Sequence, residues 1–339
     1  MNLPEVPDCK KWKGKSTPEQ DVLQKLQDRK KITKEEVDIL DCAFRFYGKA
    51  FNAMRSVDLS RINHRQADFL KRYLLDVINI ELILQNPITV NTVYRMTWVE
   101  DFNEENEKVR NPQFLSLTPL EVVKEKKKLG RANTNESTCL YLAQTPQVAV
   151  FECKPDSGDR IIITYWQAIE NKPLIMYPVN TPEKVNQSVL KATNALDQHL
   201  DLSNPHVAKI IKVIQNFIGS EFIKDDPVTN EFRYEYLYSA YFADKVMNSK
   251  IKIPNKSNEI LFGQYDGIIY PSIATQYNYD NLAVRESSVP KLRPVLCHEY
   301  LIRKTGYENF DGDENLLPFE GDLIRTSKSI CDQIIWDDD

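Results

Sequence analysis

The chain has 339 residues, of which 42% are hydrophobic and 27% charged, and its formal net charge is −5. This composition is that of a globular protein with an ordinary core, and the mild negative charge excludes the broad basic surface of a nucleic-acid-binding protein. Glycine is scarce, with 10 residues, and neither a G-x-G-x-x-G nor a Walker A motif occurs. We therefore expect no glycine-rich phosphate loop and no direct nucleic-acid partner.

The six cysteines and four histidines are scattered along the chain. They form no C-x-x-C pair and no H-E-x-x-H motif, so we expect no metal site. Cysteines spaced in this way are typical of a reducing compartment. The first 20 residues lack the apolar centre of a secretory signal, and no run approaches the roughly 20 apolar residues of a membrane span. We expect a cytoplasmic protein that does not bind membranes.

The N-terminal part of the chain has a helical pattern. Residues 1–16 are polar, and we expect them to be flexible. Thr33 and Glu36 form the two ends of a capping box before a series of apolar residues at helical spacing. A second helical pattern ends at Pro87, because proline cannot continue a helix. The sequence predicts an all-helical unit over residues 17–87, with about three helices judged from periodicity.

Strand patterns begin at residue 88 and are mixed with helical ones. β-Branched and aromatic residues predict strands, and these lie at 92–98, 139–143, 160–168, 172–178, 265–272, and around 281–285 and 291–302. Thr–Pro pairs at Thr118 and Thr145 predict helix starts, because threonine caps a helix and proline suits its first turn. Two helices are predicted over 182–222 and an aromatic-rich amphipathic helix over 232–247.

The order of these elements predicts the fold class. Strands and helices follow no regular βαβ rhythm, so we expect an α+β fold. We divide the chain into the flexible N-terminus, the helical unit, a main domain over residues 88–304 and an acidic C-terminal extension over 305–339.

Four ionisable or polar residues stand in otherwise apolar surroundings. Arg95 lies inside a strand, Arg131 opens a turn, Glu152 closes a helix and Ser272 leaves a buried strand. Taken singly, the arginines are explained as charges that reach solvent, and the serine as a turn residue. Glu152 opposes the helix dipole. Such misfits concentrate at functional sites, although a salt bridge to Lys154 explains this one equally well.

Taken together, these segments resemble the RES-domain family, which is named for a characteristic arginine, glutamate and serine. The matching pieces are VYRMTW at 93–98, GRAN at 130–133, LYLA at 140–143, the helix that ends at Glu152, DGIIYPS at 266–272 and NLAV at 281–284. The order and spacing carry the likeness, which covers residues 88–300. The resemblance implies a core similar to that of ADP-ribosyltransferases, with a mixed or antiparallel sheet and flanking helices.

The resemblance also implies a function. Members of the family consume NAD⁺ as a substrate rather than a cofactor and release nicotinamide. They transfer the ADP-ribosyl group to inorganic phosphate, to water or to a protein. Many are toxins that are held inactive by an antitoxin protein. We therefore expect an NAD⁺ phosphorylase or NAD⁺ glycohydrolase that acts as a toxin by depleting NAD⁺.

The residue types fit this chemistry. Cleavage of the nicotinamide–ribose bond passes through an oxocarbenium-like state, as at other glycosidic centres. Nicotinamide is cationic in NAD⁺ and leaves without a general acid, so one carboxylate suffices. Glu152 is the candidate that stabilises the developing positive charge. Arg95 and Arg131 are candidates to bind the pyrophosphate, because guanidinium matches phosphate with two parallel hydrogen bonds.

The remaining candidates have supporting roles. Tyr141 would stack on nicotinamide or hydrogen-bond near it, and Ser272 would bind a phosphate or ribose oxygen. Asn133 is also expected among the residues that bind NAD⁺, where it would brace the turn that carries Arg131; the alternative is a plain turn residue.

Two other functions stay open. The chain could be a protein ADP-ribosyltransferase with a macromolecular acceptor, or a RES-like interaction module without activity whose N-terminal helices bind a partner. The sequence decides neither the acceptor, nor whether an antitoxin exists, nor whether the chain forms a homo-oligomer.

Overall fold

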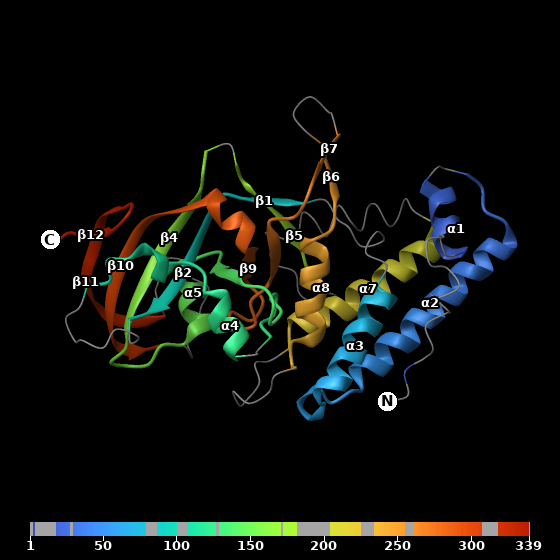
Figure 1. Ribbon diagram of the computed structural model, residues 1–339, viewed down its shortest axis with the longest axis horizontal. Coiled ribbons are helices and arrows are strands. Elements are labelled where there is room, and N and C mark those ends of the chain that lie inside the picture. Colours follow the sequence, from blue (N-terminus) through green and yellow to red (C-terminus); the bar gives the residue numbers. More distant parts are fainter. Residues whose placement is uncertain are drawn as a thin grey trace.

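The structure is a computed structural model. It describes residue 3 and residues 18–27, 30–78, 87–99, 108–126, 129–170, 172–181, 204–224, 234–254, 260–306 and 318–338. The described residues form a broad β-sheet at one end of the molecule and a group of long helices at the other (Figure 1).

The main sheet has ten strands in the order β1-β5-β8-β9-β3-β2-β4-β10-β11-β12. β5 and β8 run parallel, and the other neighbouring pairs are antiparallel. The strands are β1 Ile88–Val90, β2 Thr92–Trp98, β3 Cys139–Ala143, β4 Arg160–Ala168, β5 Leu174–Pro178, β8 Gly267–Pro271, β9 Asp280–Arg285, β10 Leu292–Thr305, β11 Phe319–Ile330 and β12 Ile334–Trp336. A separate pair joins β6 Ile251–Pro254 and β7 Ile260–Gly263. The predicted α+β class with a mixed sheet is confirmed.

The predicted N-terminal helices are confirmed as α1 Pro18–Gln27, α2 Lys34–Arg55 and α3 His64–Val77. The capping box at the start of α2 is present, because Thr33 Oγ1 accepts a hydrogen bond from the amide of Glu36, whose carboxylate accepts one from the amide of Thr33. Of the two helices predicted over 182–222, the second is α7 Pro205–Phe222. The first lies outside the described residues. The aromatic-rich helix is α8 Leu237–Met247, which begins later than the predicted residue 232.

The N-terminal helices pack against α7 and α8. The rings of Phe51 in α2 and Phe217 in α7 stack with their centroids 4.4 Å apart, and Arg55 donates a hydrogen bond of 2.9 Å to the carbonyl of Asn216. One hydrophobic core contains buried residues of α2, α3, α7 and α8 together with Ile268 of β8 and Ala283 of β9. The helical unit is therefore joined to the sheet by a continuous apolar core.

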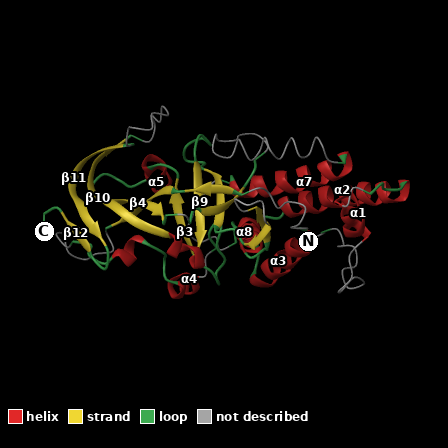
Figure 2. Cartoon of the chain, turned by 90° about the horizontal axis from the view of Figure 1, so that it is seen from above, coloured by secondary structure: helices red, strands yellow, loops and turns green. Residues whose placement is uncertain are grey.

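Different segments cover the two faces of the sheet near β4. Ile161 and Ile163 cluster with Val148 of helix α5 Pro146–Cys153. Ile162 and Trp166 instead cluster with Leu115 from the segment after β2, as expected from the alternation of side chains along a strand. Helices α5 and α4, Leu120–Lys126, lie on opposite sides of the sheet in Figure 2.

The C-terminal region continues the sheet. β10 crosses the predicted boundary at residue 304, and β11 and β12 add two strands beyond it. Half of the side chains of β11 are exposed, and its polar composition predicted no strand. Among the helices that the structure describes, none has the length and apolar character needed to cross a membrane.

Candidate functional site

Glu152 lies in the last turn of α5 and is held from two other elements. Helix α5 starts as predicted, with Thr145 as N-cap and Pro146 in the first turn, and it ends where Lys154 adopts a left-handed conformation with φ of 50°. The hydroxyl of Ser272 donates to Glu152 Oε1 at 2.5 Å. The amide of Asn281 donates to the same oxygen at 2.7 Å. The carboxylate is thus bound to β9 and to the end of β8 rather than to Lys154.

The two oxygens of this carboxylate have different surroundings. Both hydrogen bonds reach Oε1, and within the described part of the chain no hydrogen bond reaches Oε2. Ser272 is itself fully buried, and its hydroxyl also accepts from the amide of Thr275. The serine and the asparagine therefore fix the orientation of Glu152, and Oε2 is left to accept from a ligand.

A large pocket opens beside Glu152, between β2 and β3. The register of these two strands contains one pair, Tyr94 with Ala143, so the strands diverge on either side of it. The pocket has a volume of about 1030 Å³, at the upper end of the range for small-molecule sites. Its wall includes Tyr94 to Trp98 from β2, Tyr141 to Ala143 from β3, and Glu152 and Cys153 from α5. Residues from segment 111–119 and α4 form another part of the wall, and Ala149, Tyr270, Asn281 and Glu286 complete it.

Arg95 places a positive charge in this pocket. It lies on β2, cross-strand from Thr164, and among the described residues no hydrogen bond or ion pair to its guanidinium is found. Burial lowers the pKa of Arg95, because removal from water disfavours the charged form. Guanidinium nevertheless stays protonated in proteins. A bound anion would supply the missing counter-charge.

Tyr141 lines the same pocket, but its hydroxyl is bound to the turn that precedes β3. It donates to Asn133 Oδ1 at 2.8 Å and accepts from the amide of Ala132 at 3.0 Å. Burial raises the pKa of Tyr141 well above its usual value. The side chain of Asn133 also donates to the carbonyls of Thr134 and Ser137 and so braces the turn. Its part in NAD⁺ binding stays a prediction.

Arg131 binds neighbouring protein groups. Its Nη1 donates to the carbonyl of Phe222 at the end of α7, and its guanidinium lies 4.8 Å from the ring centroid of Tyr236. Among the described residues lining the pocket, Arg95 and Tyr141 are present, whereas Arg131 and Ser272 are not. The bond to Phe222 uses one of the five N–H donors of the guanidinium. The direct role of Arg131 in binding phosphate stays a prediction.

The buried ring of Tyr270 is the common neighbour of the predicted residues. Burial raises its pKa well above the usual value, and Tyr141, Glu152 and Tyr236 act in the same direction while Arg131 opposes them. Tyr270 also lines the pocket. Arg131, Tyr141 and Glu152 are therefore all near enough to Tyr270 to act on its pKa.

Asn281 and Cys153 lie at the site but were not among the site residues predicted from the sequence. Asn281 opens the NLAV motif, and an asparagine is disfavoured inside an apolar strand, so that misfit was the available signal. Cys153 follows Glu152 in the chain and lines the same pocket as Arg95. Burial raises the pKa of its thiol to about 12, although Arg95 acts in the opposite direction. The thiol is therefore neutral at pH 7.

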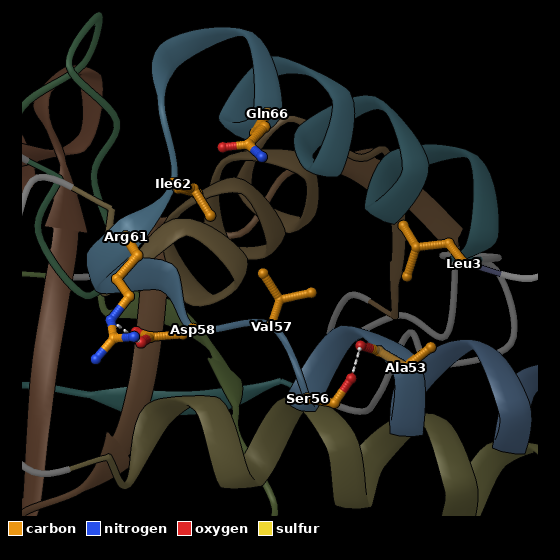
Figure 3. A pocket seen from close by; sticks show the side chains of 8 residues that line it. All are labelled: Leu3, Ala53, Ser56, Val57, Asp58, Arg61, Ile62 and Gln66. Atoms are coloured by element: carbon orange, nitrogen blue, oxygen red, sulfur yellow. Dashed lines mark hydrogen bonds and ion pairs between the residues drawn. The ribbon is translucent and has the colours of Figure 1, made fainter. Parts of the chain in front are cut away.

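A second, smaller hollow lies between α2 and α3 and has a volume of about 360 Å³. Its polar side chains bind one another or the backbone (Figure 3). Arg61 pairs with Asp58 at 2.9 Å, and the hydroxyl of Ser56 donates to the carbonyl of Ala53. Because these groups have partners, this hollow is a weaker candidate for a ligand site than the pocket at Glu152.

Neither a metal site nor a known relative helps to assign the pocket. Within the described part of the chain, no group of three or more His, Cys, Asp or Glu residues is placed to hold a metal ion. Comparison of the chain with protein-family models, with curated proteins and with solved structures found no match.

Proposed function

We propose that the protein degrades NAD⁺ by cleaving the bond between nicotinamide and ribose. One observation carries the proposal. Glu152 presents a carboxylate with one fixed and one open oxygen to a pocket in which Arg95 is a cation without a described counter-ion. A carboxylate for a ribosyl cation and a guanidinium for a pyrophosphate are the two charges that this reaction needs. The resemblance of the motifs to the RES-domain family supports the same conclusion.

The reaction requires little acid–base chemistry from the protein. The C–N bond to ribose breaks, and its electron pair goes to the pyridinium nitrogen, so nicotinamide leaves as a neutral molecule. The positive charge moves to the ribose carbon and ring oxygen, where the carboxylate of Glu152 stabilises it. Oε2 accepts hydrogen bonds from the ribose hydroxyls. An oxygen of phosphate or water then forms the new bond to carbon, and in the case of water one proton is lost to solvent.

The other residues position the substrate. Arg95 binds the pyrophosphate, and Tyr141 and Tyr270 provide aromatic surface beside the reacting ribose. Ser272 and Asn281 keep the carboxylate in one orientation, so less reorganisation is needed during the reaction.

The test is an assay of nicotinamide release from NAD⁺ by the purified protein, with and without inorganic phosphate. We expect release by the wild type, and Glu152→Gln should lower kcat roughly 100- to 1000-fold, as removal of other preorganised groups does. Glu136→Gln, at an exposed glutamate in the turn before β3, is the matched control and should leave the rate unchanged. No nicotinamide release in either condition would refute the proposal.

The product identifies the acceptor. ADP-ribose 1″-phosphate would show phosphorolysis, and ADP-ribose would show hydrolysis. Transfer of label from NAD⁺ to a protein in a lysate would instead identify an ADP-ribosyltransferase. We further propose that the activity makes the protein a toxin, so that expression lowers cellular NAD⁺ and growth, and that Glu152→Gln relieves both effects.

A further inference from the structure

We propose that the end of the pocket at Trp98 binds the adenine ring, so that NAD⁺ lies along β2. This inference rests on the proposed function and adds which end of the substrate lies where. Its evidence is the order of the pocket residues along one strand and the exposed aromatic surface at the far end.

The distance between the two ends of the pocket follows from the positions of their residues along strand β2. Glu152 is bound to Asn281, which is paired with Ala143, and Ala143 is paired with Tyr94 at the start of the diverging region. Trp98 lies four residues farther along β2, which at the rise of a strand is about 13 Å. Both ends line the same pocket.

Arg95 lies between these two ends. Along β2 the order is the level of Glu152, then the guanidinium of Arg95, then the indole of Trp98. NAD⁺ has the same order of groups, with the nicotinamide ribose first, the pyrophosphate next and adenosine last. If Glu152 contacts the ribose and Arg95 the pyrophosphate, the adenine ring is directed toward Trp98.

The far end has the chemistry that a base requires. Trp98 is 37% exposed and Phe114 is 52% exposed, and both line the pocket, whose wall also includes Leu117 and Val122. Any nucleic-acid base can stack on an aromatic side chain, because every base has a flat π face. The exposed amide of Gln113 in the same wall supplies a group of the kind that pairs with the edge of adenine.

Equilibrium binding without turnover tests the assignment. The probes are ADP-ribose, which contains adenine, and nicotinamide mononucleotide, which contains the nicotinamide ribose but no adenine. Calorimetry is performed on the full chain as wild type, Trp98→Ala, Trp98→Phe and Phe69→Ala. Phe69 is an exposed aromatic residue of α3, with 47% exposure, and it is the matched control.

The proposal expects a selective loss. Trp98→Ala should raise the Kd of ADP-ribose at least about fivefold, the lower end of what base stacking contributes, and leave the Kd of nicotinamide mononucleotide unchanged. Trp98→Phe should restore most of the affinity, and Phe69→Ala should have no effect. Because Trp98 is partly exposed, the urea midpoint of Trp98→Ala should match that of the wild type.

Three results would overturn the adenine site. These are an unchanged Kd of ADP-ribose in Trp98→Ala, an equal loss for both probes, or no binding of ADP-ribose to the wild type. The nicotinamide-release assay decides the proposed function separately. An enzyme that releases nicotinamide while Trp98→Ala binds ADP-ribose normally would keep that function and lose only this assignment.

Discussion

Asn281 and Glu152 are separated by 129 residues in the chain, yet the asparagine amide lies 2.7 Å from Glu152 Oε1. With Ser272 on the same oxygen, the carboxylate is held in one orientation. The helix dipole disfavours a negative charge at this end of α5, and the two donors offset that effect. The unfavourable position of the Glu152 charge at the end of a helix is therefore compensated by groups far away in the chain.

The first prediction concerns these two donors. Asn281→Ala and Ser272→Ala should each lower kcat for nicotinamide release, by roughly 10- to 100-fold, because misplacement of a catalytic group by about 1 Å has effects of this size. KM for NAD⁺ should change little, since in the structure both side chains bind Glu152 and Arg95 is the residue proposed to bind the pyrophosphate. Steady-state kinetics of the purified variants measure both constants.

Ser288→Ala is the matched control for Ser272→Ala. Ser288 is also buried, and its hydroxyl also donates to a carboxylate, that of Asp266. It lies outside the pocket wall that the structure describes. If Ser288→Ala lowers kcat as much as Ser272→Ala does, the effect reflects general loss of stability and the positioning role of Ser272 is wrong.

The second prediction concerns the turn that holds Tyr141. A Cβ at Gly130 would lie 2.2 Å from Asn133 Oδ1 and 2.4 Å from Tyr141 Oη. Gly130→Ala should therefore displace the tyrosine and destabilise the protein by about 1–3 kcal/mol, the usual cost of overpacking. Gly48 in α2 has no atom within 4 Å of its added Cβ. Gly48→Ala should stabilise by about 0.5–1 kcal/mol. Urea unfolding measures the change in the free energy of unfolding for each variant. If Gly130→Ala is stabilised as Gly48→Ala is, the contact at Gly130 is contradicted.

Local features of the fold could be predicted from the sequence because their causes are local. Thr33 with Glu36, and Thr145 with Pro146, satisfy backbone groups within one turn of helix. The strands at 92–98 and 139–143 have the β-branched and aromatic residues that fit a pleated surface. The bounds of these two strands and the start of the helix after Thr145 were predicted correctly.

Long-range relationships could be predicted only in part. The motifs indicated that Arg131, Tyr141, Glu152 and Ser272 belong together, but not what each side chain contacts. That Arg131 binds the carbonyl of Phe222 depends on the packing of α7, which no local pattern encodes. Strand β11 was missed because half of its side chains are exposed and its pairing with β10 is made by the backbone.

The third prediction concerns the pH dependence of α1 docking. The hydroxyl of Tyr47 donates to Glu19 Oε1 at 3.1 Å, and burial raises the pKa of Glu19 despite this bond. The folded state therefore prefers the protonated acid, and stability falls as pH rises from the unfolded pKa through the folded one. Glu19→Gln keeps an acceptor for Tyr47 without the charge. It should raise Tm at pH 7.5 and leave Tm unchanged near pH 4.

The control for this prediction is Glu35→Gln, at the exposed start of α2. The pKa of Glu35 is lowered by hydrogen bonds at the helix start, so its charged form is the favoured one. The pKa shift of Glu35 is thus opposite in sign to that of Glu19, and Glu35→Gln should not raise Tm at pH 7.5. A higher Tm for both variants at pH 7.5 would indicate a general charge effect rather than burial of Glu19.

The last prediction concerns the wall of the pocket opposite α5. Trp336 in β12 is fully buried, and its Nε1 donates to the carbonyl of Val109 at 3.0 Å. The amide of Ile334 donates to the carbonyl of Arg110 at 2.7 Å. These bonds join the last strand to the start of the segment that lines the pocket from residue 111 onward. We expect the C-terminal strand to hold that wall in place.

Two substitutions of the same kind separate the hydrogen bond from the lost ring volume. Trp336→Phe leaves the carbonyl of Val109 without its donor and should cost about 1–3 kcal/mol. Trp166 is also buried, but among the described residues its Nε1 has no hydrogen-bond partner, so Trp166→Phe loses no hydrogen bond and should cost less. Hydrogen exchange over residues 110–117 should quicken in Trp336→Phe alone, and KM for NAD⁺ should rise with it. Equal exchange in the two variants would show that the wall is held by packing rather than by β12.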